Sequence, residues 1–161
     1  MKLKWTKLID KSGHEAGREL LAALYREETR QSLPPIAHTP LGKPYFPGES
    51  WHFSISHTPR HAFCCLSRHP VGVDAEETDR AVDLRLIERY LSTSEQRRLA
   101  LAQDKNAAFL RLWVLKEALA KATGRGIGNW LKETDFDPDD PRVTCIDGCY
   151  VAILEGEHYG F

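Results

Sequence analysis

The sequence predicts a single α+β domain over residues 1–161, with antiparallel sheets. Two observations predict this fold class. First, β-prone runs and helical patterns follow the order strand, helix or helices, strand, strand, and this order occurs twice. Second, 42% hydrophobic and 28% charged residues are typical of one globular core. We therefore expect a duplicated unit, with halves at about 1–70 and 71–161.

The first half begins with a strand and a helix. Residues 2–9 are β-prone, alternate at their start and are followed by a turn-like sequence. Ser12 and Glu15 have the spacing of a capping box, in which each side chain binds the other residue's backbone N–H. Leucines at helical spacing then predict an amphipathic helix to about Arg30.

A long crossing and a strand pair complete the first half. Residues 32–50 are rich in proline and glycine, which disfavours regular structure and predicts an irregular loop. Residues 51–56 and 61–67 are short β-prone runs separated by a turn-like sequence. We expect these two runs to form an antiparallel pair.

The second half begins with a strand at 71–75 and continues with helices. Ser92 and Glu95 form a second capping box, which opens a polar helix to about Ala102. A long helix is expected from about 106 to 123, because glycines follow it directly.

Two short strands close the second half. Residues 143–146 and 149–154 flank the dipeptide Asp147-Gly148, which favours a two-residue hairpin turn. The tail is therefore expected to form a β-hairpin.

Charge and hydropathy exclude several classes of protein. Lysine and arginine number 22 against 23 acidic residues, so the net charge of -1 predicts no general attraction to nucleic acid or to anionic membranes. No run of about 18 apolar residues suits a membrane span, and residues 1–5 lack the features of a secretory signal. We expect a soluble cytoplasmic protein.

The four cysteines leave two alternatives open beside a structural role. Cys64 and Cys65 are adjacent, and Cys145 and Cys149 flank the expected hairpin turn. Such cysteines can form disulfides or bind zinc. Small buried cysteines within strands are the commoner outcome and the one that we expect.

The strand at 71–75 and the residue after it carry two carboxylates. Because alternate side chains of a strand share a face, Asp74 and Glu76 would lie on one face while Val71 and Val73 pack on the other. Two such carboxylates suit Mg²⁺, which binds oxygen ligands and substrate phosphates. The alternative is a solvated strand face followed by an acidic turn.

The long helix carries Glu117 and Lys121, which lie one turn apart on the same face as Trp113. A carboxylate and an ammonium in this position can serve phosphate chemistry. A glutamate four residues before a lysine is also an ordinary helix-stabilising pair, worth about 0.2–0.5 kcal/mol.

Three further residues are candidates for binding phosphate. Lys43 lies between glycine and proline in a restrained loop, where its ammonium can act as a point charge. Ser56 and His57 end an expected strand, which places a hydroxyl and an imidazole at a rim. By themselves, all three are equally compatible with ordinary surface positions.

Four segments together resemble the ordered motifs of the 4'-phosphopantetheinyl transferases. They are 42–44 (GKP), 53–57 (FSISH), 71–76 (VGVDAE) and 113–121 (WVLKEALAK). The resemblance extends from residue 42 to about residue 127, and its specificity comes from the order, spacing and identity of the segments together.

The resemblance implies a fold and an activity. The fold is a pseudo-dimer of two fused strand-helix-strand-strand halves, working as a monomer. The activity is Mg²⁺-dependent transfer of 4'-phosphopantetheine from coenzyme A to a serine of an apo acyl or peptidyl carrier protein. Adenosine 3',5'-bisphosphate is released.

The resemblance also implies roles for individual residues. The metal ligands of the family fall on Asp74, Glu76 and Glu117. Lys121 matches the lysine that contacts phosphate and assists proton transfer, and Glu95 matches a carboxylate near the active site. The base that takes the serine proton remains open between Glu117 and a metal-bound water.

Other positions are candidates for binding coenzyme A and the carrier protein. Lys43, Ser56 and His57 match positions that hold the coenzyme's phosphates. The N-terminal half is shorter than usual for fused members of the family. The candidates for binding the 3'-phosphate of the coenzyme are Arg18, Arg26 and Arg30. The candidates for docking an acidic carrier protein are Arg85, Arg89, Arg97 and Arg98. For both sets the alternative is an ordinary solvent-exposed helix surface.

Two other functions remain as alternatives. A non-catalytic module would bind coenzyme A or a carrier protein, but the presence of all three carboxylates and Lys121 argues against it. A Mg²⁺-dependent nuclease or phosphohydrolase would use similar carboxylates, but a nuclease would need a more basic surface.

Overall fold

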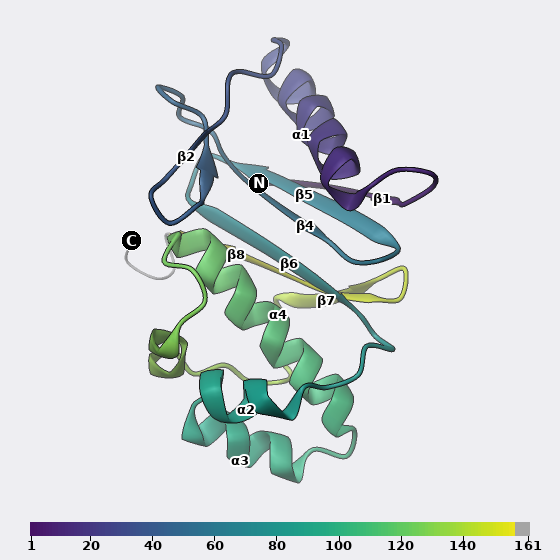
Figure 1. Ribbon diagram of the computed structural model, residues 1–161, viewed down its shortest axis with the longest axis vertical. Helices are drawn as coiled ribbons and strands as arrows, with labels where there is room; N and C mark the ends of the chain where they lie inside the picture. The colour runs from purple at the N-terminus through teal and green to yellow at the C-terminus, as the bar shows by residue number, and fades with distance from the viewer. Residues whose placement is uncertain (157–161) are drawn as a thin grey trace.

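The computed structural model describes residues 1–156 and arranges them in four layers (Figure 1). A helix covers one three-stranded sheet, this sheet packs on a second three-stranded sheet, and a long helix covers the outer face of the second sheet. The α+β class with antiparallel sheets is confirmed. The last five residues of the expected second half lie outside the described residues.

The first sheet has the order β1 (Lys2–Lys7), β5 (His61–Ser67), β4 (His52–His57), and all its pairs are antiparallel. Helix α1 (Gly13–Thr29) lies on its outer face. The expected strands and helix are confirmed. Their shared core contains Leu21, Leu24, Tyr25, Phe46, Phe53, Cys64 and Leu66.

The ends of α1 follow from local chemistry. The Ser12 side chain accepts a hydrogen bond from the Glu15 N–H, which is one of the two bonds of the expected capping box. Arg30 adopts a left-handed conformation with φ 63° and donates its N–H to Arg26, which ends the helix.

The crossing at 32–50 is irregular, as expected, apart from one small ladder. Strands β2 (Ala37–His38) and β3 (Pro44–Tyr45) pair with each other over two residues each. This ladder holds the turn that carries Lys43 close to Gly124, at the end of a helix of the second half.

The second sheet has the order β6 (Val71–Glu77), β8 (Cys149–Glu155), β7 (Val143–Ile146), again antiparallel. Asp147 and Gly148 have φ values of 47° and 80°, as a two-residue hairpin turn of type I′ requires, so the expected tail hairpin is confirmed. Strand β6 extends two residues beyond the expected end at Ala75.

One long helix covers the outer face of the second sheet, and two shorter helices lie beyond it. Helix α4 (Lys105–Thr123) packs directly on the sheet and ends at Gly124, whose φ of 71° is left-handed. Helix α3 (Thr93–Leu101) starts with the expected capping box, in which both bonds are present. Helix α2 (Leu84–Tyr90) was not predicted, because its seven residues are too few to show a helical period. A 3₁₀ turn, Asn129–Glu133, follows α4.

The inner faces of the two sheets form a third core cluster. It joins Phe63 and Cys65 of β5 to valines of β6 and β8, such as Val73. Beside it, β4 and β6 are linked through serine side chains, since Ser54 Oγ accepts from the Val73 N–H at 3.0 Å and Ser56 Oγ accepts from the Ala75 N–H at 3.2 Å. The expected valine face of β6 is therefore correct, and it faces the first sheet.

The contact between β6 and α4 depends on Gly72. A Cβ atom at this position would overlap the Ala118 carbonyl oxygen and the Ala122 nitrogen. Glycine therefore allows the helix backbone to approach the strand closely. This approach brings the side chains of α4 beside those of β6.

Two further expectations concern cysteines and membranes. All four cysteines are free, so the disulfide alternative is wrong, and Cys64, Cys65 and Cys149 are buried in strands as expected while Cys145 is exposed. Among residues 1–156, no helix has both the length and the apolar character that crossing a membrane requires.

Candidate functional site

The centre of the candidate site is the carboxylate of Asp74 on β6. Its side chain lies between β4 and α4, and the residue is only 3% exposed. Oδ1 accepts hydrogen bonds from Ser56 Oγ at 3.0 Å and from Lys121 Nζ at 2.7 Å. Oδ2 is buried and has no hydrogen-bond partner. Asp74 therefore does not belong to a solvated strand face.

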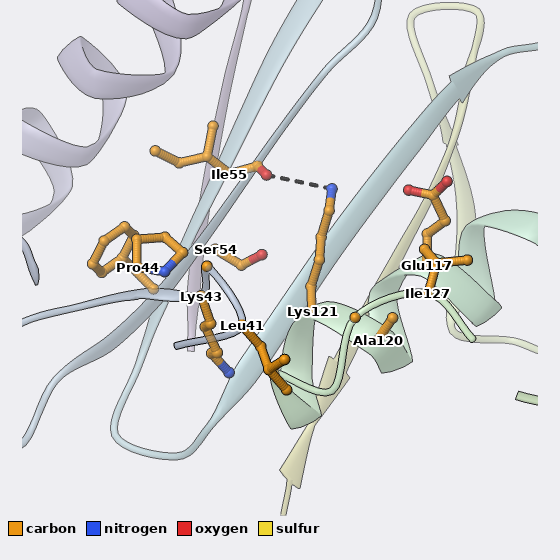
Figure 2. A pocket seen from close by; sticks show the side chains of 13 residues that line it. Leu41, Lys43, Pro44, Ser54, Ile55, Glu117, Ala120, Lys121 and Ile127 are labelled. Atoms are coloured by element: carbon orange, nitrogen blue, oxygen red, sulfur yellow. Dashed lines mark hydrogen bonds between the residues drawn. The ribbon is translucent and has the colours of Figure 1, made fainter. Parts of the chain in front are cut away.

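Lys121 is directed away from its own helix and towards the strands. Besides Asp74, its ammonium donates to the carbonyls of Val73 at 3.1 Å and Ile55 at 3.4 Å. Figure 2 shows the side chain reaching from α4 towards the Ile55 carbonyl. No ion pair joins Lys121 to Glu117 among the described residues, so the alternative of an ordinary helix pair is wrong.

Glu117 lies one turn before Lys121 and close to Asp74. Burial, together with the negative charge of Asp74, raises the pKa of the Glu117 carboxyl from 4.5 to about 7, although Lys121 and Arg80 act in the opposite direction. Two adjacent carboxyl groups, one with an unpartnered buried oxygen, are suited to share a proton or a cation. This pair is the feature of the site that best fits a divalent ion.

The third expected ligand, Glu76, points to the same side of β6 as Asp74 but binds a different partner. Its Oε1 forms an ion pair with Arg80, four residues along the chain. The side chain of Glu76 is 16% exposed. The structure thus brings Asp74 and Glu117 together and holds Glu76 on a guanidinium beside them.

A pocket of about 300 Å³ opens next to this pair (Figure 2). Its polar lining includes Lys43, Ser54, Glu117 and Lys121. Its apolar lining includes Leu41, Pro44, Phe53, Ile55 and Ile127. The pocket therefore joins cationic groups and an apolar wall beside the Asp74 and Glu117 carboxyl groups.

Lys43 reaches this pocket from the irregular crossing. Its ammonium donates a hydrogen bond to the Ala122 carbonyl at the C-terminal end of α4. Burial lowers the pKa of Lys43 from 10.5 to about 8. At neutral pH it is a partly desolvated cation, which is suited to bind an anionic group.

Ser56 and His57 occupy different environments, although they are adjacent. Ser56 is buried and bonded to Asp74, so its expected position at a rim is wrong. His57 is exposed, lies over Gly13 at the start of α1, and lines a separate hollow of about 660 Å³ with Glu76 and Arg80. The expected phosphate-binding residues are thus divided between two neighbouring hollows.

Glu95 has a structural environment of its own. It is fully buried and forms an ion pair with Lys116 at 2.8 Å. Its carboxylate also accepts the backbone N–H groups of Ser92 at 2.7 Å and Phe136 at 2.8 Å. Lys116 also donates a hydrogen bond to the carbonyl of Leu131 at 2.7 Å. The ion pair of Glu95 and Lys116 therefore links α3 and the 3₁₀ turn to α4.

The remaining basic candidates lie outside the pocket. Arg18, Arg26 and Arg30 are exposed on or after α1, and none of them lines it. Arg85 is bound to Asp83 and Arg98 to Asp135, both at the surface. The other two expected docking residues, Arg89 and Arg97, are exposed.

Sequence reasoning missed two residues of the site. Ser54 lines the pocket and holds β6 in place, and its position two residues before Ser56 on one strand would have indicated a shared face. Arg80 binds Glu76, and nothing in the local sequence distinguishes it from other surface arginines.

Comparison with known proteins places the part of the chain that contains β6 and α4 in one family. Residues 70–154, more than half of the chain, match the model of the 4'-phosphopantetheinyl transferase superfamily. The segment contains β6, α4, β7 and nearly all of β8.

Individual relatives agree with this match. The 4'-phosphopantetheinyl transferase Sfp of Bacillus subtilis is 37% identical over 90 residues, which cover 53% of this chain and 39% of the relative. A phosphopantetheinyl transferase of Thraustochytrium is 30% identical over 155 residues, which cover 82% of this chain and 53% of the relative. The holo-[acyl-carrier-protein] synthase of Staphylococcus saprophyticus is 32% identical over 105 residues, which cover 56% of this chain and 90% of the relative. The chain thus matches well under half of the Bacillus protein's length but almost all of the staphylococcal one.

Proposed function

Because the chain belongs to the 4'-phosphopantetheinyl transferase superfamily, we propose that it transfers 4'-phosphopantetheine from coenzyme A to a serine of an apo acyl or peptidyl carrier protein. Such a reaction uses Mg²⁺ and releases adenosine 3',5'-bisphosphate. The observation that carries the proposal is the unpartnered Asp74 Oδ2 beside the Glu117 carboxyl, since Glu117 lines a pocket together with Lys43 and Lys121.

The residues present fit a magnesium ion. Asp74 and Glu117 would hold it, and Glu76 would join them after leaving Arg80. One or two carboxylates completed by phosphate oxygens are the usual protein environment of Mg²⁺. When bound there, the ion neutralises phosphate charge and orients the phosphorus for attack.

The chain's own cations complete the binding of the pyrophosphate. Lys121 is anchored by Asp74 and by two backbone carbonyls, so its position is set before a ligand arrives. Lys43 lines the same pocket, and His57 lies at the neighbouring hollow. We assign these groups to the phosphates of the donor and the apolar wall to its uncharged part.

We also propose that the chain works as a monomeric pseudo-dimer with halves at about 1–70 and 71–161. In both sheets, the first strand of the half pairs with its last strand, and the middle strand lies at an edge. In each half, a helix covers the outer face of the sheet. Exposed Arg89 and Arg97 would meet the acidic carrier protein.

The test is to incubate the protein with coenzyme A, Mg²⁺ and a panel of apo-carrier proteins and to measure the intact mass of each carrier. At least one carrier should gain the mass of phosphopantetheine. Glu117→Gln should abolish this gain while the circular dichroism spectrum stays unchanged. Glu88→Gln, an exposed glutamate on α2, is the matched control and should remain active.

Two outcomes would overturn the proposal. If coenzyme A binds but no carrier gains mass, the chain is a non-catalytic binding module. If coenzyme A or another phosphate ester is hydrolysed without any carrier, the chain is a Mg²⁺-dependent phosphohydrolase.

A further inference from the structure

A second cluster of ligand-type side chains lies on the opposite face of β6 from Asp74. It consists of His61 on β5, Glu77 at the end of β6, and Cys149 at the start of β8. The three residues are 4%, 5% and 0% exposed. The cluster therefore joins the first sheet, through His61, to the second sheet.

The three ligand atoms converge on one point. Cys149 Sγ lies 3.3 Å from His61 Nδ1, and Glu77 Oε1 lies 3.1 Å from the same nitrogen. Within residues 1–156, this is the only group of three such side chains whose ligand atoms all lie within 4.8 Å of one another. Tetrahedral zinc separates its ligand atoms by about 3.3 Å (N to O) and about 3.6 Å (N to S). The two distances from Nδ1 differ from these zinc values by only a few tenths of an ångström.

Each ligand is oriented by a neighbour. Asp147 Oδ2 lies 2.8 Å from His61 Nε2, and Arg60 Nη2 donates to Glu77 Oε2 at 2.8 Å. A carboxylate on the outer nitrogen of a histidine is the usual support of a metal-binding imidazole. Here Nε2 faces Asp147, and Nδ1 faces Cys149 and Glu77.

On the inner side, Glu77 Oε1 also accepts a hydrogen bond from the Thr58 hydroxyl. A zinc ion bound to Nδ1 and to the thiolate would take the place of the protons that lie between His61, Glu77 and Cys149. A hollow of about 400 Å³ opens beside the cluster and is lined by His61, Glu77 and Asp147.

We propose that His61, Glu77 and Cys149 bind a zinc ion that joins the two sheets, at a site separate from the carboxylates of Asp74 and Glu117. A set of imidazole, thiolate and carboxylate suits zinc, whereas Mg²⁺ takes oxygen ligands. The ion stabilises the contact between β5 and β6, and so the end of the strand that carries Glu76.

The test is titration of the full chain with Co²⁺ and Zn²⁺ after removal of bound metals with a chelator. Co²⁺ should produce a thiolate-to-cobalt charge-transfer band, saturating at about one ion per chain, which Zn²⁺ then abolishes. The carboxylates of the candidate transferase site cannot produce this band. Zinc at about one hundred times its Kd should raise the Tm by about 5–10 °C.

Variants identify the ligands. Cys149→Ser should lose the band, and Glu77→Gln should weaken Co²⁺ binding by about tenfold or more. Cys145→Ser, at the exposed cysteine of β7, is the matched control and should keep the band, as should Glu117→Gln. If Cys149→Ser does not fold, the presence or absence of the band in the wild-type protein still shows whether a thiolate binds the ion.

Two results would overturn the proposal. One is a folded wild-type chain without the charge-transfer band, in which case hydrogen bonds alone join His61 to Glu77 and Asp147. The other is a band that persists in folded Cys149→Ser.

Discussion

The Lys121 ammonium pairs with the Asp74 carboxylate at 2.7 Å, across the contact between α4 and β6. Only one oxygen of Asp74 takes part, and the other remains buried without a partner. Lys121 thus compensates part of the Asp74 charge, and the remainder is available to an ion. The stability of the metal-free protein should depend on this pair.

We expect Lys121→Met to lower the free energy of unfolding by about 1–3 kcal/mol in the absence of Mg²⁺, because Asp74 then keeps only the Ser56 hydrogen bond. Urea denaturation measures this change. Lys132→Met, at an exposed lysine, should change it by less than about 0.5 kcal/mol. Equal stabilities of the two variants would show that the pair contributes nothing.

The stability of the metal-free protein should fall with rising pH because of Glu117. Its carboxyl pKa is raised from 4.5 to about 7, first by burial and then by Asp74, so the folded state holds this proton more tightly than the unfolded state. The contribution is complete below about pH 4.5 and is lost as the pH rises through about 7.

Relative to Glu117→Gln, the wild-type protein should therefore lose on the order of 2 kcal/mol of unfolding free energy between about pH 5 and about pH 8. Urea unfolding in EDTA at several pH values measures this difference. Glu77 does not titrate in this window: burial acts to raise its pKa, but hydrogen bonds from Thr58, Arg60 and His61 outweigh it and hold the pKa at about 2. Parallel profiles of variant and wild type would contradict the expectation.

Arg80 should compete with the metal ion for Glu76. In Arg80→Gln the Glu76 carboxylate is released and a nearby positive charge is removed, so Mg²⁺ should bind about 3–10-fold more tightly. Calorimetric titration with Mg²⁺ measures this affinity. Arg85→Gln, at an arginine whose partner is Asp83, is the control and should leave it unchanged. Weaker binding in Arg80→Gln would mean that the guanidinium helps to build the site.

Gly72→Ala should separate α4 from β6. The added Cβ would overlap backbone atoms of Ala118 and Ala122, which cannot rotate away as a side chain can. We expect a loss of about 3 kcal/mol or more in unfolding free energy. Any folded variant should also have lower transferase activity, because Glu117 and Lys121 move with the helix. Chemical denaturation and the carrier-protein mass assay measure the two effects, and wild-type values in both would contradict the close approach.

Most of the secondary structure could be predicted from local chemistry. Ser92 and Glu95 determine where α3 begins, Gly124 determines where α4 ends, and Asp147-Gly148 determines the last turn. Each of these signals involves residues close together in the chain. Helix α2 was missed because a helix of two turns carries too few apolar positions to show a period.

The candidate site was predictable only in its list of residues. The motifs named Asp74, Glu117 and Lys121, and the structure places all three around the β6 and α4 contact. The partners were not predictable. Glu117 and Lys121 have the spacing of a helix pair, yet Lys121 binds across to the strands.

The sequence by itself therefore determined most of the secondary-structure elements, the family and the chemically competent residues, because these depend on short-range spacing. Only the tertiary structure decided that Asp74 keeps one oxygen free, that Arg80 holds Glu76, and that Glu95 is buried against Lys116. The first and third of these arrangements join segments that are 21 or more positions apart in the chain. They depend on how the two sheets and α4 pack, which determines the neighbours of each side chain.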